Sequence, residues 1–184
     1  MYIDRILFPI YTLGPGSRLV IWTKGCTKKC KNCSNPELWN IGKTKDRYIK
    51  DLFQLILNIN KENQIDGITF TGGEPTEQFD ELIEFIKLLK EITNDILVYT
   101  GEYFDNFSEN KKEKIKKTIP VLIDGPYIHK LNFKYVNLRG SKNQNIIYFN
   151  KKLRHKYKEY MKKGRMIQNV LMGEKLISVG IHNK

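Results

Sequence analysis

The sequence predicts an α/β protein built on a mostly parallel sheet. Short runs rich in β-branched and aromatic residues alternate with longer segments whose apolar residues recur at helical spacing. Two of the predicted strands run directly into glycine-containing loops, and alternating strands and helices are typical of parallel sheets with right-handed crossovers. A chain of 184 residues corresponds to about one domain. We therefore expect one domain, residues 1–184, with too few strand–helix units to close a full (β/α)8 barrel.

The first two thirds of the chain contain most of the predicted sheet. A GPG turn at residues 14–16 opens the first unit, because glycine adopts backbone conformations that other residues resist. Apolar runs predict buried strands, and helical spacing of apolar residues predicts helices. The strands are expected at residues 18–23, 67–71, 96–100 and 119–123, and the helices at about 46–60, 79–89 and 106–117.

The last third of the chain is less regular, and we expect the core of the domain at about residues 12–149. Residues 138–144 are expected to form a loop before a strand at 146–149. A basic helix is expected at 151–163, where Gly164 would end it. Two final runs, 166–172 and 175–179, flank Gly173 and Glu174 and predict a hairpin.

All three cysteines of the chain lie within eight residues, as Cys26, Cys30 and Cys33. An odd, tightly spaced set of thiols with no other cysteine to pair with is typical of a metal site. Thiolates hold iron–sulfur clusters, and three of them would leave one iron of a four-iron cluster open. The CxxxCxxC spacing therefore predicts a cluster with one free coordination position.

Two other interpretations of these cysteines remain open at this point. A structural zinc site would require a fourth Cys or His ligand, and the three histidines lie far downstream. Cys30 and Cys33 alone form a CxxC motif of the kind that exchanges thiols in thioredoxin-like proteins, which would leave Cys26 without a role.

The cysteine spacing closely resembles that of the radical S-adenosylmethionine superfamily. Further landmarks resemble the activating enzymes of glycyl-radical enzymes: the GPG turn with Arg18, the strand and Gly25 that precede the cysteines, and Asn35–Glu37 after them. The short length and residues 139–144 are most similar to the activases of anaerobic ribonucleoside-triphosphate reductases. The resemblance covers about residues 12–149.

This resemblance implies a fold, two cofactors and a reaction. The fold would be an open, partial (β/α) barrel, and Cys26, Cys30 and Cys33 would ligate a 4Fe-4S cluster whose open iron binds S-adenosylmethionine. One electron would split the cofactor into methionine and a 5′-deoxyadenosyl radical, which would take a hydrogen atom from a glycine of the partner, an anaerobic ribonucleotide reductase. A one-electron reductant such as flavodoxin or ferredoxin would supply the electron. A radical enzyme acting on another protein, a peptide or a small molecule is the alternative.

The resemblance also assigns residues to the cofactor. Asn32 and Ser34 flank the last cysteine, where the family's cluster loop meets the cofactor. Gly72, Gly73 and Glu74 match the GGE motif, whose backbone contacts the methionyl amino group in the family. Thr100 and Asp124 end the third and fourth predicted strands and would face the same site, with strand-end capping as their alternative role.

The loop departs from the family pattern at three positions. Asn32 stands where the superfamily usually has an aromatic residue, and Lys31-Asn32 stand where the activases often have Pro-Gly. Lys24 replaces a more usual glutamine. Stacking on the adenine must then come from another residue, and Trp39 is a candidate.

The formal net charge of +12 favours anionic partners. Between residues 151 and 165, eight basic residues accompany one acid, Glu159. We hypothesise that this helix docks an acidic face of the partner enzyme through Lys156, Lys158 and Lys162. A solvated lysine-rich face is the simplest alternative. A metal-bearing nucleic-acid-binding module is another, but no recognisable nucleic-acid fold accompanies the charge, so nucleic acid is not the expected partner.

The sequence predicts a cytoplasmic protein without a membrane segment. The apolar run at residues 7–10 is too short for the hydrophobic region of a signal peptide, and no later run approaches the length of a membrane span. Three unpaired thiols also suit a reducing compartment.

Overall fold

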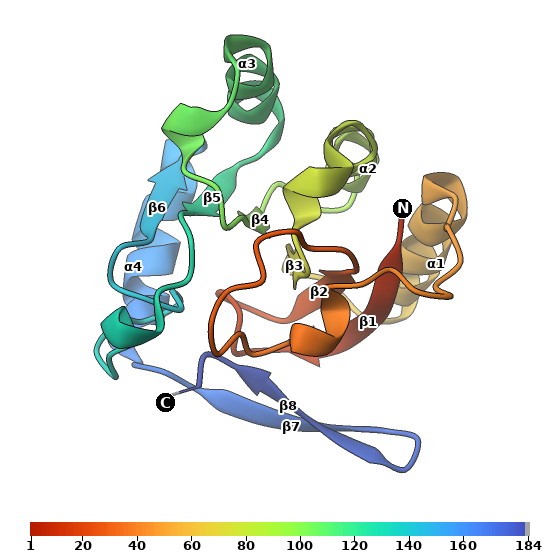
Figure 1. The fold of residues 1–184 in the computed structure, drawn as a ribbon. Helices are drawn as coiled ribbons and strands as arrows, with labels where there is room; N and C mark the ends of the chain where they lie inside the picture. Colours follow the sequence, from red (N-terminus) through yellow and green to blue (C-terminus); the bar gives the residue numbers. More distant parts are fainter. Residues whose placement is uncertain (183–184) are drawn as a thin grey trace.

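A computed structural model describes residues 1–182, in which six strands form one open sheet (Figure 1). The strands lie in the order β1 to β6, and the four central ones, β2 to β5, run parallel. Strands β1 and β6 pair antiparallel at the two edges and do not pair with each other. The predicted α/β class with a mostly parallel sheet is confirmed. The bounds are β1 Ile3–Ile10, β2 Arg18–Thr23, β3 Gly67–Gly72, β4 Ile96–Tyr99, β5 Val121–Asp124 and β6 Asn145–Tyr148.

The central strands form where the sequence is almost continuously apolar. Every residue of β2 is buried, as expected for a parallel strand covered on both faces. Successive side chains point to opposite faces. Leu19 and Ile21 therefore pack into one core cluster, whereas Val20 and Trp22 pack into another. The sheet thus has two separate apolar layers.

Three helices cover one face of the sheet: α1 (Ile49–Glu62), α2 (Phe79–Leu89) and α3 (Glu109–Thr118). Each connects two neighbouring parallel strands, as in repeated β–α–β units. The predicted helices are present, with ends shifted by a few residues; a 3-10 turn at Phe104–Asn106 precedes α3. Across residues 1–182, none of the helices has the length and apolar character needed to cross a membrane.

The opposite face is covered by α4 (Arg154–Lys162) and by the hairpin of β7 (Ile167–Met172) and β8 (Lys175–Gly180). Tyr157 and Tyr160 of α4 pack against Leu97 and Val121 of the sheet. The predicted hairpin is confirmed. The predicted basic helix is also present, although its first turn, Lys151–Leu153, is a 3-10 turn.

The buried carboxylate of Asp95 fastens α4 to the sheet. The guanidinium of Arg18 is fully buried, donates to Thr69 Oγ1 at 2.7 Å, and lies 3.1 Å from a carboxylate oxygen of Asp95. The hydroxyl of Tyr157 donates to the same carboxylate at 2.7 Å, and Lys156 Nζ approaches its other oxygen at 2.8 Å. Asp95 therefore joins a strand, a loop and α4 through one carboxylate.

Strand β1 has no counterpart among the predicted elements. Its side chains alternate, so that Ile6 and Phe8 pack toward the helices while Leu7 and Ile10 pack toward the hairpin. Asp4, Arg5 and Pro9 interrupt its apolar residues, so the segment is not recognised as a strand from its own sequence. Antiparallel pairing with β2 stabilises this strand, and that pairing cannot be recognised from the sequence of β1 alone.

Candidate functional site

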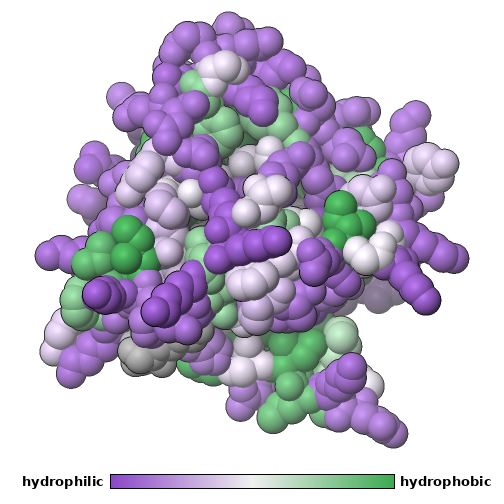
Figure 2. Space-filling view, in the orientation of Figure 1, coloured by the Kyte–Doolittle hydropathy of each residue, from purple (hydrophilic) through white to green (hydrophobic). Residues whose placement is uncertain are grey.

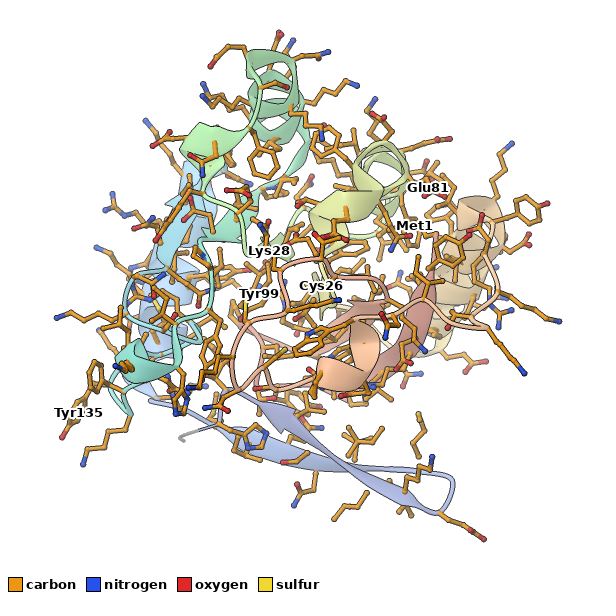
Figure 3. All side chains as sticks on the ribbon, viewed as in Figure 1. Met1, Cys26, Lys28, Glu81, Tyr99 and Tyr135 are labelled. Atoms are coloured by element: carbon orange, nitrogen blue, oxygen red, sulfur yellow. The ribbon has the colours of Figure 1, made fainter. Side chains whose placement is uncertain are left out.

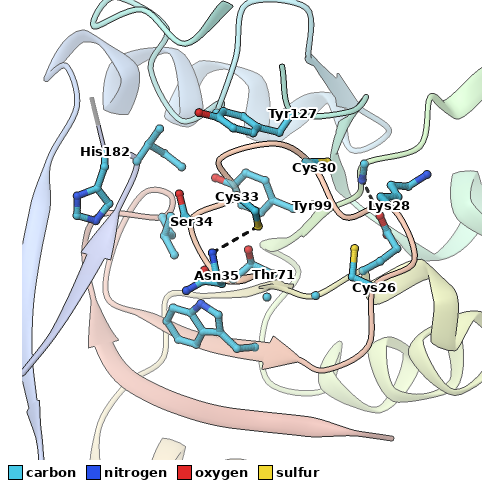
Figure 4. Close-up of a pocket in the computed structure, with 18 of the residues that line it drawn as sticks. Cys26, Lys28, Cys30, Cys33, Ser34, Asn35, Thr71, Tyr99, Tyr127 and His182 are labelled. Carbon is cyan, nitrogen blue, oxygen red and sulfur yellow. Dashed lines mark hydrogen bonds between the residues drawn. The ribbon is translucent and has the colours of Figure 1, made fainter. Parts of the chain in front are cut away.

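The three cysteines lie on a loop at the carboxyl end of β2 (Figure 4). The N–H of Gly25 donates to the carbonyl of Leu38 at 2.8 Å, and the N–H of Cys26 donates to the carbonyl of Trp39 at 2.9 Å. These bonds tie the start of the loop to the segment that leaves it. Lys29 and Asn32 have φ values of +44° and +56°, in the left-handed region, which lets the chain turn sharply between the cysteines. The three thiols are consequently presented from one short loop, each partly exposed.

The GGE loop after β3 packs against the cysteine loop with no space for side chains. A Cβ atom on Gly73 would lie 2.3 Å from the carbonyl oxygen of Gly25, and one on Gly72 would lie 2.6 Å from that of Thr23. The N–H groups of Gly73 and Glu74 donate to the carbonyls of Thr23 and Gly25, both at 2.8 Å. These N–H groups are therefore used to fix the cysteine loop. A ligand with an ammonium group does not need these N–H groups, because an ammonium group only donates. It would bind to carbonyl oxygens of the GGE loop.

The side chain of Glu74 bridges two loops beneath the site. It is 3% exposed, and its carboxylate accepts from the N–H and hydroxyl of Thr76 and from the N–H of Gly101 at 2.7 Å. The hydroxyls of Thr76 and Thr100 lie 3.1 Å apart. Glu74 and Thr100 thus hold the loops after β3 and β4 in register.

Two carboxylates anchor the middle of the cysteine loop. The N–H and hydroxyl of Thr27 donate to Glu77 Oε1 at 2.8 and 2.6 Å. The ammonium of Lys28 lies 2.9 Å from Glu102 Oε2. Burial opposes the charge on Lys28, but the hydrogen bond and the charge of Glu102 outweigh it and raise the pKa of Lys28. The same hydrogen bond lowers the pKa of Glu102. Both groups are therefore charged around neutral pH.

Cys26 lies in a mixed environment. Burial raises the pKa of its thiol, and the backbone N–H groups of Lys28 and Lys29 oppose this by favouring the thiolate. A metal ligand must be deprotonated, so loading of a metal centre at Cys26 would release a proton. Figure 3 shows Cys26, Lys28 and Tyr99 in the middle of the molecule.

The cysteine loop, the GGE loop and β8 enclose a cavity of about 230 Å³. Its position at the carboxyl ends of parallel strands is typical of a ligand site. Figure 4 shows Cys26, Cys30 and Cys33 around it. The predicted site residues that line it are Cys26, Cys30, Cys33, Ser34, Gly72, Gly73, Glu74 and Thr100, and Trp39 lines it as well.

The donor atoms suit an iron–sulfur cluster with an organic cofactor beside it. Three thiols open into one cavity, and thiolates are the protein ligands of such clusters. The Nε1 atom of Trp39 is buried and has no hydrogen-bond partner among the described residues, so the cavity also offers a donor to a ligand. In residues 1–182, no group of three His, Cys, Asp or Glu side chains has the geometry to hold a metal ion. The fit therefore rests on the three sulfur donors, the shared cavity and the orphaned indole.

Two of the predicted cofactor residues lie outside the cavity lining. Asn32 is exposed on the cysteine loop. Asp124 is buried at the end of β5, where it accepts from the N–H of Phe104 at 2.7 Å and from the side chain of Asn145 at 2.9 Å. That arrangement is strand-end capping, the alternative role that the sequence left open.

The three lysines predicted to dock a partner differ in their surroundings. Lys156 is paired with the buried Asp95, and Lys162 lies 2.7 Å from Glu159 on the same helix. Lys158 is exposed and has no ion-pair partner within residues 1–182. Two of these three lysines are therefore paired within the molecule, and partner docking by this helix stays a hypothesis.

Part of the cavity wall was not foreseen from the sequence. Tyr127, Asn132 and His182 line it from the loop after β5 and from the end of β8 (Figure 4). The side-chain amide of Asn132 donates to the hydroxyl of Tyr127 at 3.1 Å and to the carbonyl of His182 at 3.2 Å. No local pattern connects positions 50 residues apart. Gln144, which the resemblance had marked, donates to the carbonyl of Gly125 and also lines the cavity.

A family model described as a 4Fe-4S single cluster domain matches residues 12–147. The matched range contains the cysteine loop, the GGE loop and the four parallel strands. The fold and the site therefore define an α/β iron–sulfur protein with a single 4Fe-4S cluster. The match favours the cluster over the zinc and thiol-exchange alternatives.

Relatives of known function specify the family further. The chain is 32% identical over 151 residues to the anaerobic ribonucleoside-triphosphate reductase-activating protein of Enterobacteria phage T4, which is 79% of this chain and 93% of that protein. It is 32% identical over 141 residues to the protein of the same name from Haemophilus influenzae, with 72% and 88% covered. Identity to the pyruvate formate-lyase-activating enzyme of Clostridium pasteurianum is 30% over 132 residues, 70% of this chain and 54% of that longer enzyme. The chain belongs to the radical S-adenosylmethionine family of glycyl-radical-enzyme activating proteins.

Proposed function

We propose that this protein installs a glycyl radical on an anaerobic ribonucleoside-triphosphate reductase, using its 4Fe-4S cluster and S-adenosylmethionine. One observation carries the proposal: the three-cysteine loop and the GGE loop share one cavity at the carboxyl edge of the parallel sheet. The extent of similarity to two reductase-activating proteins supports the choice of target. Radical S-adenosylmethionine chemistry is common to the family to which the chain belongs.

Each part of the site has a separate task in this proposal. Cys26, Cys30 and Cys33 would hold the cluster, and the bound cluster and cofactor together supply the one-electron cleavage that produces the hydrogen-abstracting species. Carbonyl oxygens of the GGE loop would accept from the cofactor's amino group. Trp39 would contact the adenine, since Asn32 offers no aromatic face. Ser34, at the cavity wall, would contact the cofactor beside the last cysteine.

The open sheet suits a protein substrate. We propose that the sheet curves as an open, partial barrel and that residues 1–184 act as one domain. Because β1 and β6 do not pair, the sheet leaves a side through which a loop of a partner could reach the cavity. We further propose that the protein works in the cytoplasm and receives its electron from a carrier such as flavodoxin or ferredoxin.

The test is an anaerobic assay in two stages. The protein is reconstituted with iron and sulfide, reduced chemically and mixed with S-adenosylmethionine, and 5′-deoxyadenosine is quantified. The reductase is then added, and a protein glycyl radical is sought by electron spin resonance. Cys30→Ala should lose the product and the radical. Lys31→Ala is the matched control, because it changes the exposed neighbouring residue of the same loop without removing a thiol.

The two stages separate the possible failures. Product and a glycyl signal in the wild-type protein, with neither in Cys30→Ala, would establish the proposed function. Product without a glycyl signal on the reductase would contradict the proposed target and favour another protein, a peptide or a small molecule. A fully loaded cluster that never cleaves the cofactor, with or without the reductase, would contradict the radical chemistry itself.

A further inference from the structure

The β7–β8 hairpin carries apolar residues on the face that should be polar. In the hairpin register, Leu171 pairs with Leu176 and Ile167 pairs with Gly180, so these side chains share one face. Leu171 is 71% exposed, Leu176 69% and Ile167 47%. We call Ile167, Leu171 and Leu176 the hairpin outer face. The same face also carries the polar pair Asn169 and Ser178, between Ile167 and the two leucines. An antiparallel ribbon with one face on the core normally turns polar residues to water, so the exposed apolar residues on this face require an explanation.

The opposite face of the hairpin is firmly attached to the body of the protein. Val170, Ile177 and Val179 pack into the core cluster beside β1 and β2. The side chain of Gln168 donates to the carbonyl of Pro9 and accepts from the N–H of Tyr11, both at 2.9 Å. The hydroxyl of Thr12 donates to the carbonyl of Val179 at 3.0 Å. The hairpin is therefore a fixed platform, and little ordering cost would oppose binding to it.

The hairpin is also part of the cavity wall. Residues 177–182, which are most of β8 and the segment after it, line the cavity together with the cysteines. The side chain of Asn132 joins the loop after β5 to the carbonyl of His182 at the end of this segment. Phe133, which follows Asn132 in the chain, is 48% exposed. Exposed apolar groups thus lie on two segments that border the cavity.

The picture of the surface agrees with this placement. Figure 2 shows apolar residues gathered on the hairpin, below the main body of the molecule. In the same orientation, the cysteine loop lies in front of β3 and the hairpin extends beneath it (Figure 1). The hairpin therefore projects from the body on the side where its β8 strand meets the site.

We propose that the hairpin outer face is the docking surface for the glycyl-radical partner, an inference that rests on the proposed function. The target glycine must reach a cavity whose wall is β8, so a protein that inserts a loop there lies against the hairpin. Leu171 and Leu176 lie near the turn of the hairpin, whose other end lines the cavity. Burying them would supply apolar binding energy to a partner that extends along the hairpin from the cavity. The basic helix α4 is a weaker candidate, because Lys156 and Lys162 are already paired within the molecule.

The experiment compares two double variants of equal charge change. Leu171→Glu with Leu176→Glu places two carboxylates on the hairpin outer face. Tyr48→Glu with Leu55→Glu does the same at two exposed apolar positions on the helical layer, the N-cap residue and the middle of α1. Affinity for the reductase is measured by sedimentation with the protein before cluster loading, and the glycyl radical yield and uncoupled 5′-deoxyadenosine formation are measured after loading.

We expect the hairpin variant to bind the reductase at least about tenfold more weakly, as for truncation of central apolar contacts. Its glycyl radical yield should fall at limiting concentrations while uncoupled cofactor cleavage stays at the wild-type level. The α1 variant should match the wild-type protein in all three. Equal affinity of the hairpin variant and the wild type for the reductase would overturn the proposed docking surface. It would also be overturned if the wild-type protein self-associates and the hairpin variant is monomeric with unchanged reductase binding, because the outer face would then be an interface between copies of this chain. No glycyl radical in the wild-type protein would instead overturn the proposed function.

Discussion

The ammonium of Lys28 and the carboxylate of Glu102 form an ion pair 2.9 Å long that connects the cysteine loop to the loop after β4. The two residues are 74 positions apart, and each side chain is only partly exposed, at 24% and 34%. Lys28 lies between the first and second cysteines. The pair therefore restrains the part of the loop that must hold still when the thiols bind a cluster.

Replacing Glu102 with glutamine should loosen this restraint. Because the pair is partly solvated, the expected loss in the free energy of unfolding is about 0.2–1 kcal/mol. The larger effect should be local: backbone amides of residues 26–33 should exchange with deuterium faster in the cluster-free protein. Glu113→Gln, which removes an exposed helical pair with Lys117, is the matched control and should leave the loop unchanged. Unaltered exchange in Glu102→Gln would show that the pair does not restrain the loop.

The stabilisation from this pair should depend on pH in a defined direction. The pKa of Glu102 is lowered below 4.5, so its contribution is present above 4.5 and is lost as the pH falls through the folded value. The pKa of Lys28 is raised above 10.5, so its contribution is present below 10.5 and is lost as the pH rises through the folded value. The difference in unfolding free energy between the wild type and Glu102→Gln should accordingly be constant between these limits and shrink outside them. Denaturant titrations across the acid limb would measure it, and a difference that grows in acid would contradict the assignment.

Adding a methyl group at Gly73 should separate the two loops of the site. The new Cβ would lie 2.3 Å from the carbonyl oxygen of Gly25, so the backbone must move. The expected cost is about 1–3 kcal/mol of stability, as for overpacking, together with reduced iron content after reconstitution. Gly42→Ala is the control, because nothing lies within 4 Å of the added atom there and only the left-handed backbone at φ +58° is penalised. Equal iron content in Gly73→Ala and the wild type would contradict this role.

Removing the charge of Asp95 should cost far more than removing the charge of Lys156. Asp95→Asn leaves the fully buried guanidinium of Arg18 without its carboxylate partner, which predicts a loss of about 3–5 kcal/mol. Lys156→Gln removes a side chain that is 43% exposed, and its expected cost is about 1 kcal/mol or less. Equilibrium unfolding of both variants tests the comparison. Similar losses in the two would mean that the buried Arg18–Asp95 pair contributes no more to stability than the exposed Lys156–Asp95 pair.

The parallel core of this protein could be predicted because its signal is local. Strands β2 to β5 are largely buried, so each is rich in apolar and β-branched residues, and the helices between them repeat apolar residues at helical spacing. The cluster site could be predicted equally well, because all three thiols and the GGE motif occupy short contiguous stretches. β1 was missed because Asp4, Arg5 and Pro9 interrupt its apolar residues, and because its antiparallel pairing with β2 is a tertiary contact.

What the sequence by itself determined is the set of groups that carry the chemistry: three thiols, a glycine loop and the strands that end beside them. Only the tertiary structure decided how the remaining charges and walls are used. The carboxylate of Asp95 pairs with Lys156, which is 61 positions away, and neutralises its charge. Asp124 accepts a hydrogen bond from the loop after β4. β8, near the end of the chain, forms part of the cavity wall. Periodicity and motif spacing report on neighbours in the chain, whereas ion pairs and cavity walls form between residues that only folding brings together.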